Sequence, residues 1–362
     1  MGVLELFSEV PDPRWRNTRH ELGEVLFIAL AAVLCGAENC SDMADFARSR
    51  EGVLREVLTL EYGPPSHDTF SRVFRLLDPK GFASVFYRFA EGFAAQAEAE
   101  AEAEGVVAFD GKSLKRCYER GKSYMPPLMV SAWGAHTRMT LASQLARNGN
   151  EVAAVLEMLS LFDLKGATVT ADALHCHRAM AEAVIAAHGD YALAVRGNQP
   201  ALLRDAQKAL ATAKNPQSAE TAGIDHGREE HRQITIVDAP RLGRIHNFAG
   251  LKAVARVVSQ RNGEQAERIF LLSRRPTPEK MLAIVREHWG IENRLHWMLD
   301  VVLSEDRDRT RKDNAPPNLA ILRRLALNIL RAHPDAKTPL RRKIKRAGWE
   351  PAFLFSLLAN MR

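Results

Sequence analysis

The sequence predicts a mixed α/β protein, in which an α/β core follows an all-helical N-terminal region and precedes a basic helical tail. Three observations lead to this class. Apolar residues in the first hundred positions follow helical spacing, short apolar strands alternate with helices after about residue 105, and basic residues concentrate near the C-terminus.

Composition limits the classes of protein to which the chain can belong. Its 362 residues predict two or three domains, at roughly 100 to 200 residues per domain. With 46% hydrophobic and 26% charged residues, a disordered or collagen-like chain is excluded. The most apolar stretch, Val25–Leu34, is too short for a bilayer, which takes about 20 residues, so we expect a cytoplasmic protein without a membrane partner. Four sparse cysteines without C-x-x-C spacing are expected to be reduced and mostly buried.

The N-terminal region, residues 1–96, is expected to be helical. Ser66 or Asp68 can cap a helix after the break Gly-Pro-Pro. The helices around this break could present Arg72 and Arg75 to DNA, or they could simply pack together. The predicted helices follow the apolar runs Leu22–Leu34, Met43–Leu60 and Phe70–Phe93.

The acidic Ala-Glu repeat at residues 97–104 marks a boundary, as a helix extension or a linker. Residues 105–310 then predict an α/β domain in the order strand, strand, strand, helix, strand, helix, strand, which is typical of a ribonuclease-H-like core. The strands are Val106–Asp110, Leu128–Trp133, Met139–Leu145, Ala167–Ala171 and Tyr191–Arg196, and the helices are Asn150–Phe162, capped by Asn150, and His177–Ala187.

A β-rich insertion is expected near residues 226–273, before a long helix from about Thr277 to Val302. Residues 311–362 form the basic helical C-terminal region. The strands expected in the insertion are Gln233–Val237, Leu251–Val258 and Arg268–Leu272.

Two aspartates stand at the ends of apolar strands. Asp110 ends the strand beginning at Val106, and Asp172 follows the strand ending at Ala171. Such carboxylates face the crevice where α/β sheets bind ligands, although Asp-Gly is also ordinary turn chemistry.

Glu292 supplies a third acid from the long helix. At 100° per residue it lies in a largely apolar stripe, whose other members are Val285, His288, Trp289, Leu295, His296 and Leu299. A buried carboxylate is costly unless a metal, a cation or a site function explains it, or unless it forms a salt bridge to His288 or His296. Three carboxylates without a Ser-His or Cys-His nucleophile predict two Mg²⁺ or Mn²⁺ ions that serve phosphodiester displacement.

Several segments resemble bacterial insertion-sequence DDE transposases of the H-repeat-associated group. They are VVAFDGKSLK, ATVTADALHCHR, ALAVRGNQP, REHWGIENRLHWMLDVVLSEDRDR and NAPPNLAILRRLALNIL, while PDPRWRNTRHELGEVLFIALAAVLCG and PPSHDTFSRVFRLLDP resemble that group's N-terminal associated domain. The resemblance implies a catalytic triad of Asp110, Asp172 and Glu292 in a ribonuclease-H-like core. It also implies metal-dependent cleavage and strand transfer of an insertion sequence, with the terminal inverted repeats and target DNA as partners and a dimer on DNA.

Many related transposases carry Tyr, Arg and Lys around the catalytic Glu, where this chain has Val285, His288 and Leu299. Other side chains are therefore expected to contact phosphates, although a solvated loop or a helix cap explains several of them equally well. These candidates are Lys112, Lys115, Asn198, Gln199, Arg286 and His288.

The basic tail is a second candidate DNA-binding surface. Between Arg323 and Gly348 nine basic residues face one acid, within a chain whose net charge is +6. Such a concentration is typical of polyphosphate-binding proteins, and a solvated helix face gives the same pattern. The candidates are Arg341, Arg342, Lys343, Lys345 and Arg346.

Two other functions fit the same residues. A metal-dependent nuclease would cut DNA without joining it, and a DNA-binding regulator would keep these acids only for structure. Strand-transfer product distinguishes the transposase from the nuclease, and metal dependence distinguishes both from the regulator.

Overall fold

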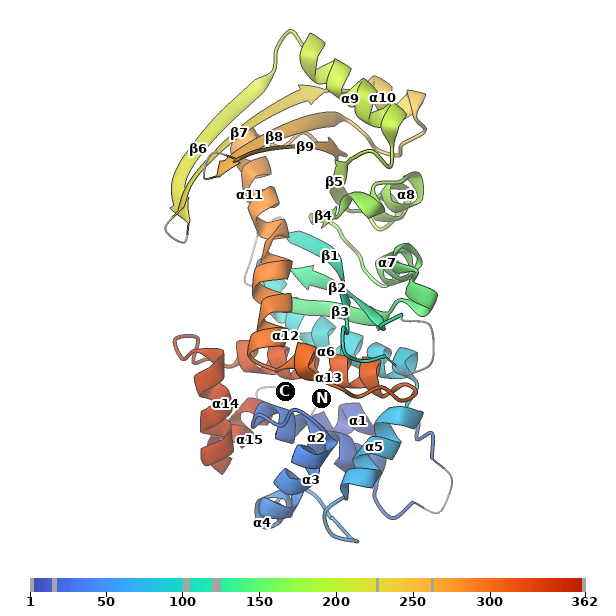
Figure 1. Cartoon of the computed structure of the whole chain (residues 1–362), viewed down its shortest axis with the longest axis vertical. Coiled ribbons are helices and arrows are strands. Elements are labelled where there is room, and N and C mark those ends of the chain that lie inside the picture. The colour runs from blue at the N-terminus through green and yellow to red at the C-terminus, as the bar shows by residue number, and fades with distance from the viewer. Residues whose placement is uncertain are drawn as a thin grey trace.

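The computed structural model describes residues 3–14, 18–99, 105–118, 125–225, 228–261 and 264–359. Figure 1 shows an elongated molecule, with the N-terminal helices toward one end and curved antiparallel strands at the other. In the described part of the chain, no helix combines the length and the apolar character needed to cross a membrane.

The N-terminal region is helical, as predicted. Its helices are α1 (Val3–Ser8), α2 (Leu22–Leu34), α3 (Cys40–Ser49), α4 (Glu51–Leu54), α5 (His67–Leu76) and α6 (Pro79–Ala99). Ser66 caps α5 by accepting a hydrogen bond from the backbone N–H of Thr69. The predicted run Phe70–Phe93 is two helices, because the ring of Pro79 disfavours helical backbone just before it. The run Met43–Leu60 is likewise divided, and the acidic spacer continues α6 as far as Ala99, beyond which residues 100–104 lie outside the described residues.

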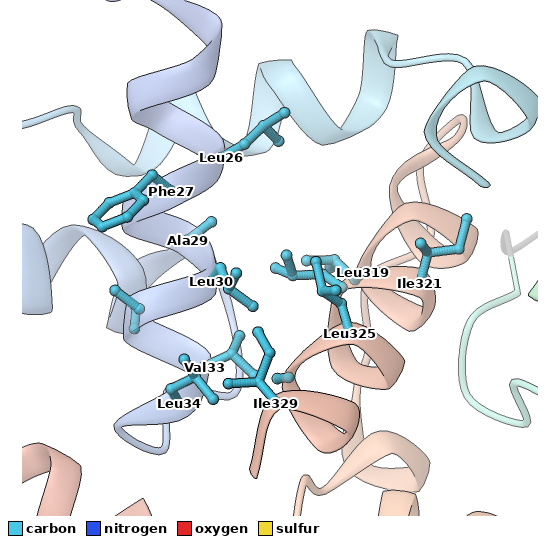
Figure 2. Packing of buried hydrophobic residues seen from close by; sticks show 14 of the residues in the cluster. Leu26, Phe27, Ala29, Leu30, Val33, Leu34, Leu319, Ile321, Leu325 and Ile329 are labelled. Atoms are coloured by element: carbon cyan, nitrogen blue, oxygen red, sulfur yellow. The ribbon is translucent and has the colours of Figure 1, made fainter. Parts of the chain in front are cut away.

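The first helix of the C-terminal region is part of the core and not an exposed tail. α13 (Ala315–Ala332) is buried along residues 315–330. Figure 2 shows Leu30 and Val33 of the fully buried α2 lying opposite Leu325 and Ile329 of α13. Two further helices follow, α14 (Leu340–Trp349) and α15 (Pro351–Ala359).

One mixed sheet has the strand order β3-β2-β1-β4-β5-β9-β8-β7-β6. β1, β4 and β5 are parallel to one another, and every other pairing is antiparallel. Each of the first five strands begins within two residues of its predicted start. These strands are β1 (Val106–Ser113), β2 (Leu128–Gly134), β3 (Met139–Leu145), β4 (Thr168–Ala171) and β5 (Asp190–Val195).

The strands expected in the insertion also form, and they extend the same sheet because β9 pairs with β5. β6 starts at Gln217, ahead of the predicted insertion, and was not predicted. The four strands are β6 (Gln217–Asp225), β7 (Arg228–Asp238), β8 (Ala253–Arg261) and β9 (Glu264–Leu272), accompanied by α9 (Pro200–Thr212) and α10 (Pro240–Ile245).

Helices cover both faces of the central strands (Figure 1). α7 (Glu151–Leu159) and α8 (Arg178–Ala186) pack with Phe109 and Val169 on one face. On the other face α11 (Pro278–His288) leads into a π-helical segment, η3 (Ile291–His296), and then α12 (Trp297–Val301). The long predicted helix is therefore present, but its middle turn is wider than an α-helical turn.

Candidate active site

Strand register brings two of the predicted acids together. Phe109 of β1 pairs with Ala171 of the parallel strand β4, so Asp110 and Asp172 come next on neighbouring strands. β1 itself continues along β2 to Ser113. The sequence had predicted Asp110 at the end of its own strand. In the structure Asp110 lies within β1, beside the end of β4.

Asp110 is the electrostatic centre of the site. Only 19% of its side chain is exposed. Burial and then the negative charge of Asp172 raise the pKa of Asp110 to about 7; a hydrogen bond from the Gly111 backbone opposes the rise, and the charges of Glu151 and Glu292 add to it. Asp110 thus lies among three other carboxylates.

Asp172 is more exposed and has a histidine beside it. Its side chain is 72% exposed, and its Oδ1 lies 3.9 Å from Nε2 of His288. The neighbouring imidazole of His288 lowers the pKa of Asp172, against the effect of burial. The other ring nitrogen, Nδ1 of His288, lies 3.0 Å from Oγ1 of Thr170, and this hydrogen bond fixes the ring next to Asp172.

Glu292 is exposed, which contradicts the expectation of an apolar stripe. It lies on η3, where Ile291 and Leu295 take the buried positions. A constant 100° per residue does not hold across the wider turns of a π-helix, so the predicted face is rotated. Glu292 nevertheless shares a cavity of about 140 Å³ with Asp172, Arg196, Arg268 and His288.

The two histidines that flank Glu292 lie beside the other acids. His288 faces Asp172, and Nδ1 of His296 lies 3.4 Å from Oδ2 of Asp110. Burial, and then the charges of Arg324 and Lys112, lower the pKa of His296 to about 3, so His296 is neutral near pH 7. Among the described residues, these histidines therefore lie next to Asp172 and Asp110, and the expected salt bridge to Glu292 does not form.

Glu151 is a fourth acid that the sequence analysis missed. It begins α7, and its Oε1 lies 2.9 Å from Nε2 of His175. A Cβ atom at Gly111 would lie 2.7 Å from the carboxyl carbon of Glu151. The one sequence signal was Asn150, whose capping role places Glu151 in the first turn.

A larger groove adjoins Glu292 on the side of the antiparallel strands. Its volume is about 830 Å³, and α11 and strands β6 to β9 line it. The guanidinium carbon of Arg268 lies 4.6 Å from the ring centroid of Trp289. The basic residues Arg232, Arg268 and Arg286 line the groove together with Glu292.

The structure contradicts the expectation that Lys112 contacts DNA. Lys112 is 7% exposed, and its Nζ lies 2.7 Å from Asp300 and 2.9 Å from Asp306. Burial alone would lower the pKa of Lys112, but the nearby carboxylates, led by Glu305, raise it. Lys115 is 67% exposed and pairs with Asp306 at 3.2 Å.

Asn198 and Gln199 lie at the loop before α9. The Nδ2 group of Asn198 donates a hydrogen bond to the carbonyl of Ala173, one residue after Asp172, at 2.7 Å. Gln199 occupies the cap position of α9 without a side-chain capping bond. Asn198 thus fastens the loop that carries Asp172.

The basic tail is only partly available to a ligand. Lys343 is buried, and its Nζ donates to the carbonyl of Leu330, which contradicts a DNA contact for that residue. Arg323 and Arg324, which the charge count included, are also buried and pair with Asp308 and Glu305. The other candidates, Arg341, Arg342, Lys345 and Arg346, are exposed; Arg341 donates to the carbonyl of Val301, and Arg346 pairs with Glu350.

Cysteine chemistry is not available to the site. All four cysteines are free, and three of them are buried. Burial raises the pKa of each thiol to about 12, so the thiolate is not populated near neutral pH.

The acids fit a hard divalent cation in their chemistry. Within the described residues, no three His, Cys, Asp or Glu side chains already form a metal-binding group. Carboxylate oxygens are the ligands that Mg²⁺ and Mn²⁺ prefer. A cation would also neutralise the repulsion that, together with burial, raises the pKa of Asp110. We therefore expect cation binding to draw the acids together.

The raised pKa of Asp110 predicts a pH dependence of stability. As pH rises from 4 to 7, the unfolded chain releases this proton before the folded protein does, so folding becomes less favourable. Asp110→Asn removes this loss. Without metal, the free energy of unfolding of the variant relative to that of the wild type should therefore rise by about 2–4 kcal/mol between pH 5 and pH 8. Urea unfolding of both proteins in EDTA measures the difference, and a constant difference would contradict the raised pKa.

Comparison with known proteins identifies the family. The model described as "Transposase DDE domain" matches residues 102–329. The chain belongs to this family. A second model, described as "DDE_Tnp_1-associated", matches residues 4–90. The family implies a DNA substrate, and DDE transposases generally use divalent metals.

Relatives support the same family over nearly the whole chain. "Putative protein YbfL" of Escherichia coli is 32% identical, in an alignment that covers 99% of this chain and 98% of the relative. "H repeat-associated putative transposase YhhI" of Escherichia coli is 31% identical with the same coverage. "Uncharacterized protein in dhlA 3'region" of Xanthobacter autotrophicus is 38% identical over 283 residues, which is 75% of this chain and 94% of the relative. The expected resemblance to the H-repeat-associated group is confirmed.

Proposed function

We propose that this DDE transposase catalyses metal-dependent DNA cleavage and strand transfer of an insertion sequence. The observation that carries the proposal is the parallel register of β1 and β4, which puts Asp110 next to Asp172. Burial, and after it the charges of nearby carboxylates, raise the pKa of Asp110. Three carboxylates from two neighbouring strands and a facing helix form a site suited to two Mg²⁺ or Mn²⁺ ions.

Asp110 would help to hold both cations, while Asp172 and Glu292 would each help to hold one. Metal ions bound there supply activation of a water or a 3′-hydroxyl and stabilisation of the leaving oxygen. His288 lies beside Asp172, and His296 lies beside Asp110. Because His296 is neutral near pH 7, it adds no positive charge that would repel a bound cation. The protein otherwise positions DNA, as phosphoryl transfer requires.

The groove beside Glu292 is the proposed path of a DNA strand to these acids. Burial and the charges of Arg196 and Arg232 lower the pKa of Arg268, whereas the charges of Asp172 and Glu292 oppose this shift. A cluster of arginines therefore adjoins the acids. Phosphates bound there would place a neighbouring phosphodiester near the carboxylates. Arg286 lines the same groove, and His288 lines the neighbouring cavity, which shares Arg268 and Glu292 with the groove. Both residues keep their proposed roles in positioning DNA.

We propose a ribonuclease-H-like core for this domain. Its support is the order β3-β2-β1-β4-β5, with β1, β4 and β5 parallel and helices on both faces. The division into residues 1–96, 105–310 and 311–362, and a dimer on DNA that joins two element ends, belong to the same proposal.

One experiment tests the function directly. Purified protein is incubated with the DNA flanking its gene and Mg²⁺, and the DNA ends produced are mapped. Cleavage at element ends and strand-transfer product from paired ends support a transposase. Cleavage without transfer would indicate a nuclease, and binding without metal-dependent cleavage would indicate a regulator.

The exposed tail residues give a prediction for DNA binding. Replacing Arg342 and Lys345 with Gln should flatten the log–log salt dependence by about two units, since each phosphate contact releases counterions. Binding should weaken alike for all sequences. Fluorescence anisotropy at several salt concentrations measures the slope.

Lys343→Met is the matched control, because this lysine is buried on α14. It should lower stability and leave the salt slope unchanged. An unchanged slope in the double variant would remove the tail from the DNA-binding surface. A selective loss of discrimination between element ends and random DNA would instead indicate base recognition.

A further inference from the structure

Glu151 borders the three acids from the opposite side of the sheet to Glu292. Glu292 lies on the helix that packs across one face of β1, whereas Glu151 starts α7 on the other face. The start of α7 is already capped, since Oδ1 of Asn150 accepts a hydrogen bond from the N–H of Ala153 at 3.0 Å. The carboxylate of Glu151 is therefore not required as the helix cap, and its side chain is only 17% exposed.

The missing side chain of Gly111 makes room for this carboxylate. A Cβ atom there would lie 2.7 Å from Cδ, 2.8 Å from Oε2 and 2.9 Å from Oε1 of Glu151. These separations are well inside van der Waals contact, so glycine alone lets the carboxylate rest on β1 directly after Asp110.

A buried histidine holds the same carboxylate from the other side. His175 is fully buried, and its Nε2 lies 2.9 Å from Oε1 of Glu151. Its backbone N–H donates to the carbonyl of Asp172 at 2.9 Å, and its Nδ1 has no hydrogen-bond partner in the described structure. Oε1 is thus fixed by His175, while Oε2 keeps its acceptor capacity.

We propose that Glu151, seated between Gly111 and His175, is a fourth carboxylate ligand for the divalent cations held by Asp110. This inference rests on the proposed function. Glu151 would supply an oxygen from the face opposite Glu292, and cations bound between the two faces would be enclosed on both sides. Carboxylate oxygens in this position suit Mg²⁺ or Mn²⁺.

A purely structural role is the competing explanation. In that case Glu151 and His175 would only connect α7 to the loop after β4. Glu151→Gln separates the two roles, because the amide oxygen can still accept a hydrogen bond from His175 but the negative charge is lost. His175→Ala does the reverse, since it breaks the connection and keeps the negative charge of Glu151.

Mn²⁺ binding by the full chain, measured by isothermal titration calorimetry without DNA, is the test. Glu151→Gln should weaken Mn²⁺ binding by about 10-fold or more and leave the melting temperature in EDTA unchanged. Gly111→Ala should weaken it as well, because the added methyl displaces the carboxylate without removing any acid. Glu157→Gln is the matched control on the same helix, where Glu157 pairs with Lys80 far along the chain, and it should bind Mn²⁺ like the wild type.

Wild-type Mn²⁺ affinity in both Glu151→Gln and Gly111→Ala would overturn the proposal. So would a loss of affinity in His175→Ala alone, which would show that only the connection matters. If Glu151→Gln does not fold, Glu151→Asp, which keeps the charge but shortens its reach, must show weakened binding for the proposal to stand. Failure of the proposed function looks different, because neither wild type nor variants would then bind Mn²⁺ or cleave DNA.

Discussion

Asp110→Asn is expected to slow DNA cleavage at least about a thousandfold, while DNA affinity in EDTA stays within about twofold. An amide cannot bridge two cations, and the loss of several kcal/mol of metal-ion stabilisation corresponds to about tenfold per 1.4 kcal/mol. The groove arginines and the exposed tail residues remain to bind phosphates. Gel analysis of end cleavage with Mg²⁺ and mobility shift in EDTA measure the two effects.

Asp163→Asn is the control, because this exposed carboxylate lies after α7 and pairs with His188, away from the acids of the site. It should cleave and bind like the wild type. Misfolding does not explain the expected loss, since removal of the Asp110 charge should stabilise the metal-free protein above neutral pH. Equal losses of binding and cleavage in Asp110→Asn would show that the residue is structural.

Local signals predicted most of the fold. The apolar run Leu22–Leu34 coincides with α2, and the strand Met139–Leu145 coincides with β3. Asn150 and Ser66 cap helices as their types predict. These features depend on neighbours a few residues away, which is why the sequence contains them.

The site was predicted less evenly, because its parts depend on contacts distant in sequence. Asp110 and Asp172 follow apolar strands, and parallel register then brings them together. Glu292 was selected from an ideal α-helical wheel, which the π-helical segment invalidates. Gly111 suggested a turn, yet it lies within β1 and accommodates Glu151 from a helix forty residues later. No local pattern indicates such a contact.

The count of charges failed where basic side chains are buried and bonded to partners inside the protein. Arg324 and Lys343 contribute to the basic tail in sequence, but both side chains are buried in the structure. Lys112 lies near Asp110 in sequence, but its ammonium binds acids about 190 residues away. A count of charges cannot distinguish a phosphate-binding lysine from one that anchors a core.

A buried ionic cluster of Glu305, Arg324, Lys112 and Asp300 is the place where we expect a single substitution to lower stability most. Glu305 is 2% exposed, and its Oε1 lies 2.8 Å from the guanidinium of the fully buried Arg324. Oε2 of Glu305 lies 3.6 Å from Nζ of Lys112. Lys112 also contacts Asp300, so the cluster connects β1 with the end of the helix that carries Glu292.

Glu305→Gln should therefore lower the free energy of unfolding by about 3–5 kcal/mol, since it leaves the Arg324 charge buried without its carboxylate. The double variant Glu305→Leu with Arg324→Met should lose less than Glu305→Gln alone, because it removes the unpaired charge together with its partner. Lys112 keeps Asp300 and Asp306 in both variants, so the difference reports on Arg324. Urea unfolding at pH 7.5 measures it, and a loss below about 1 kcal/mol in Glu305→Gln would mean that water reaches Arg324 and screens its charge.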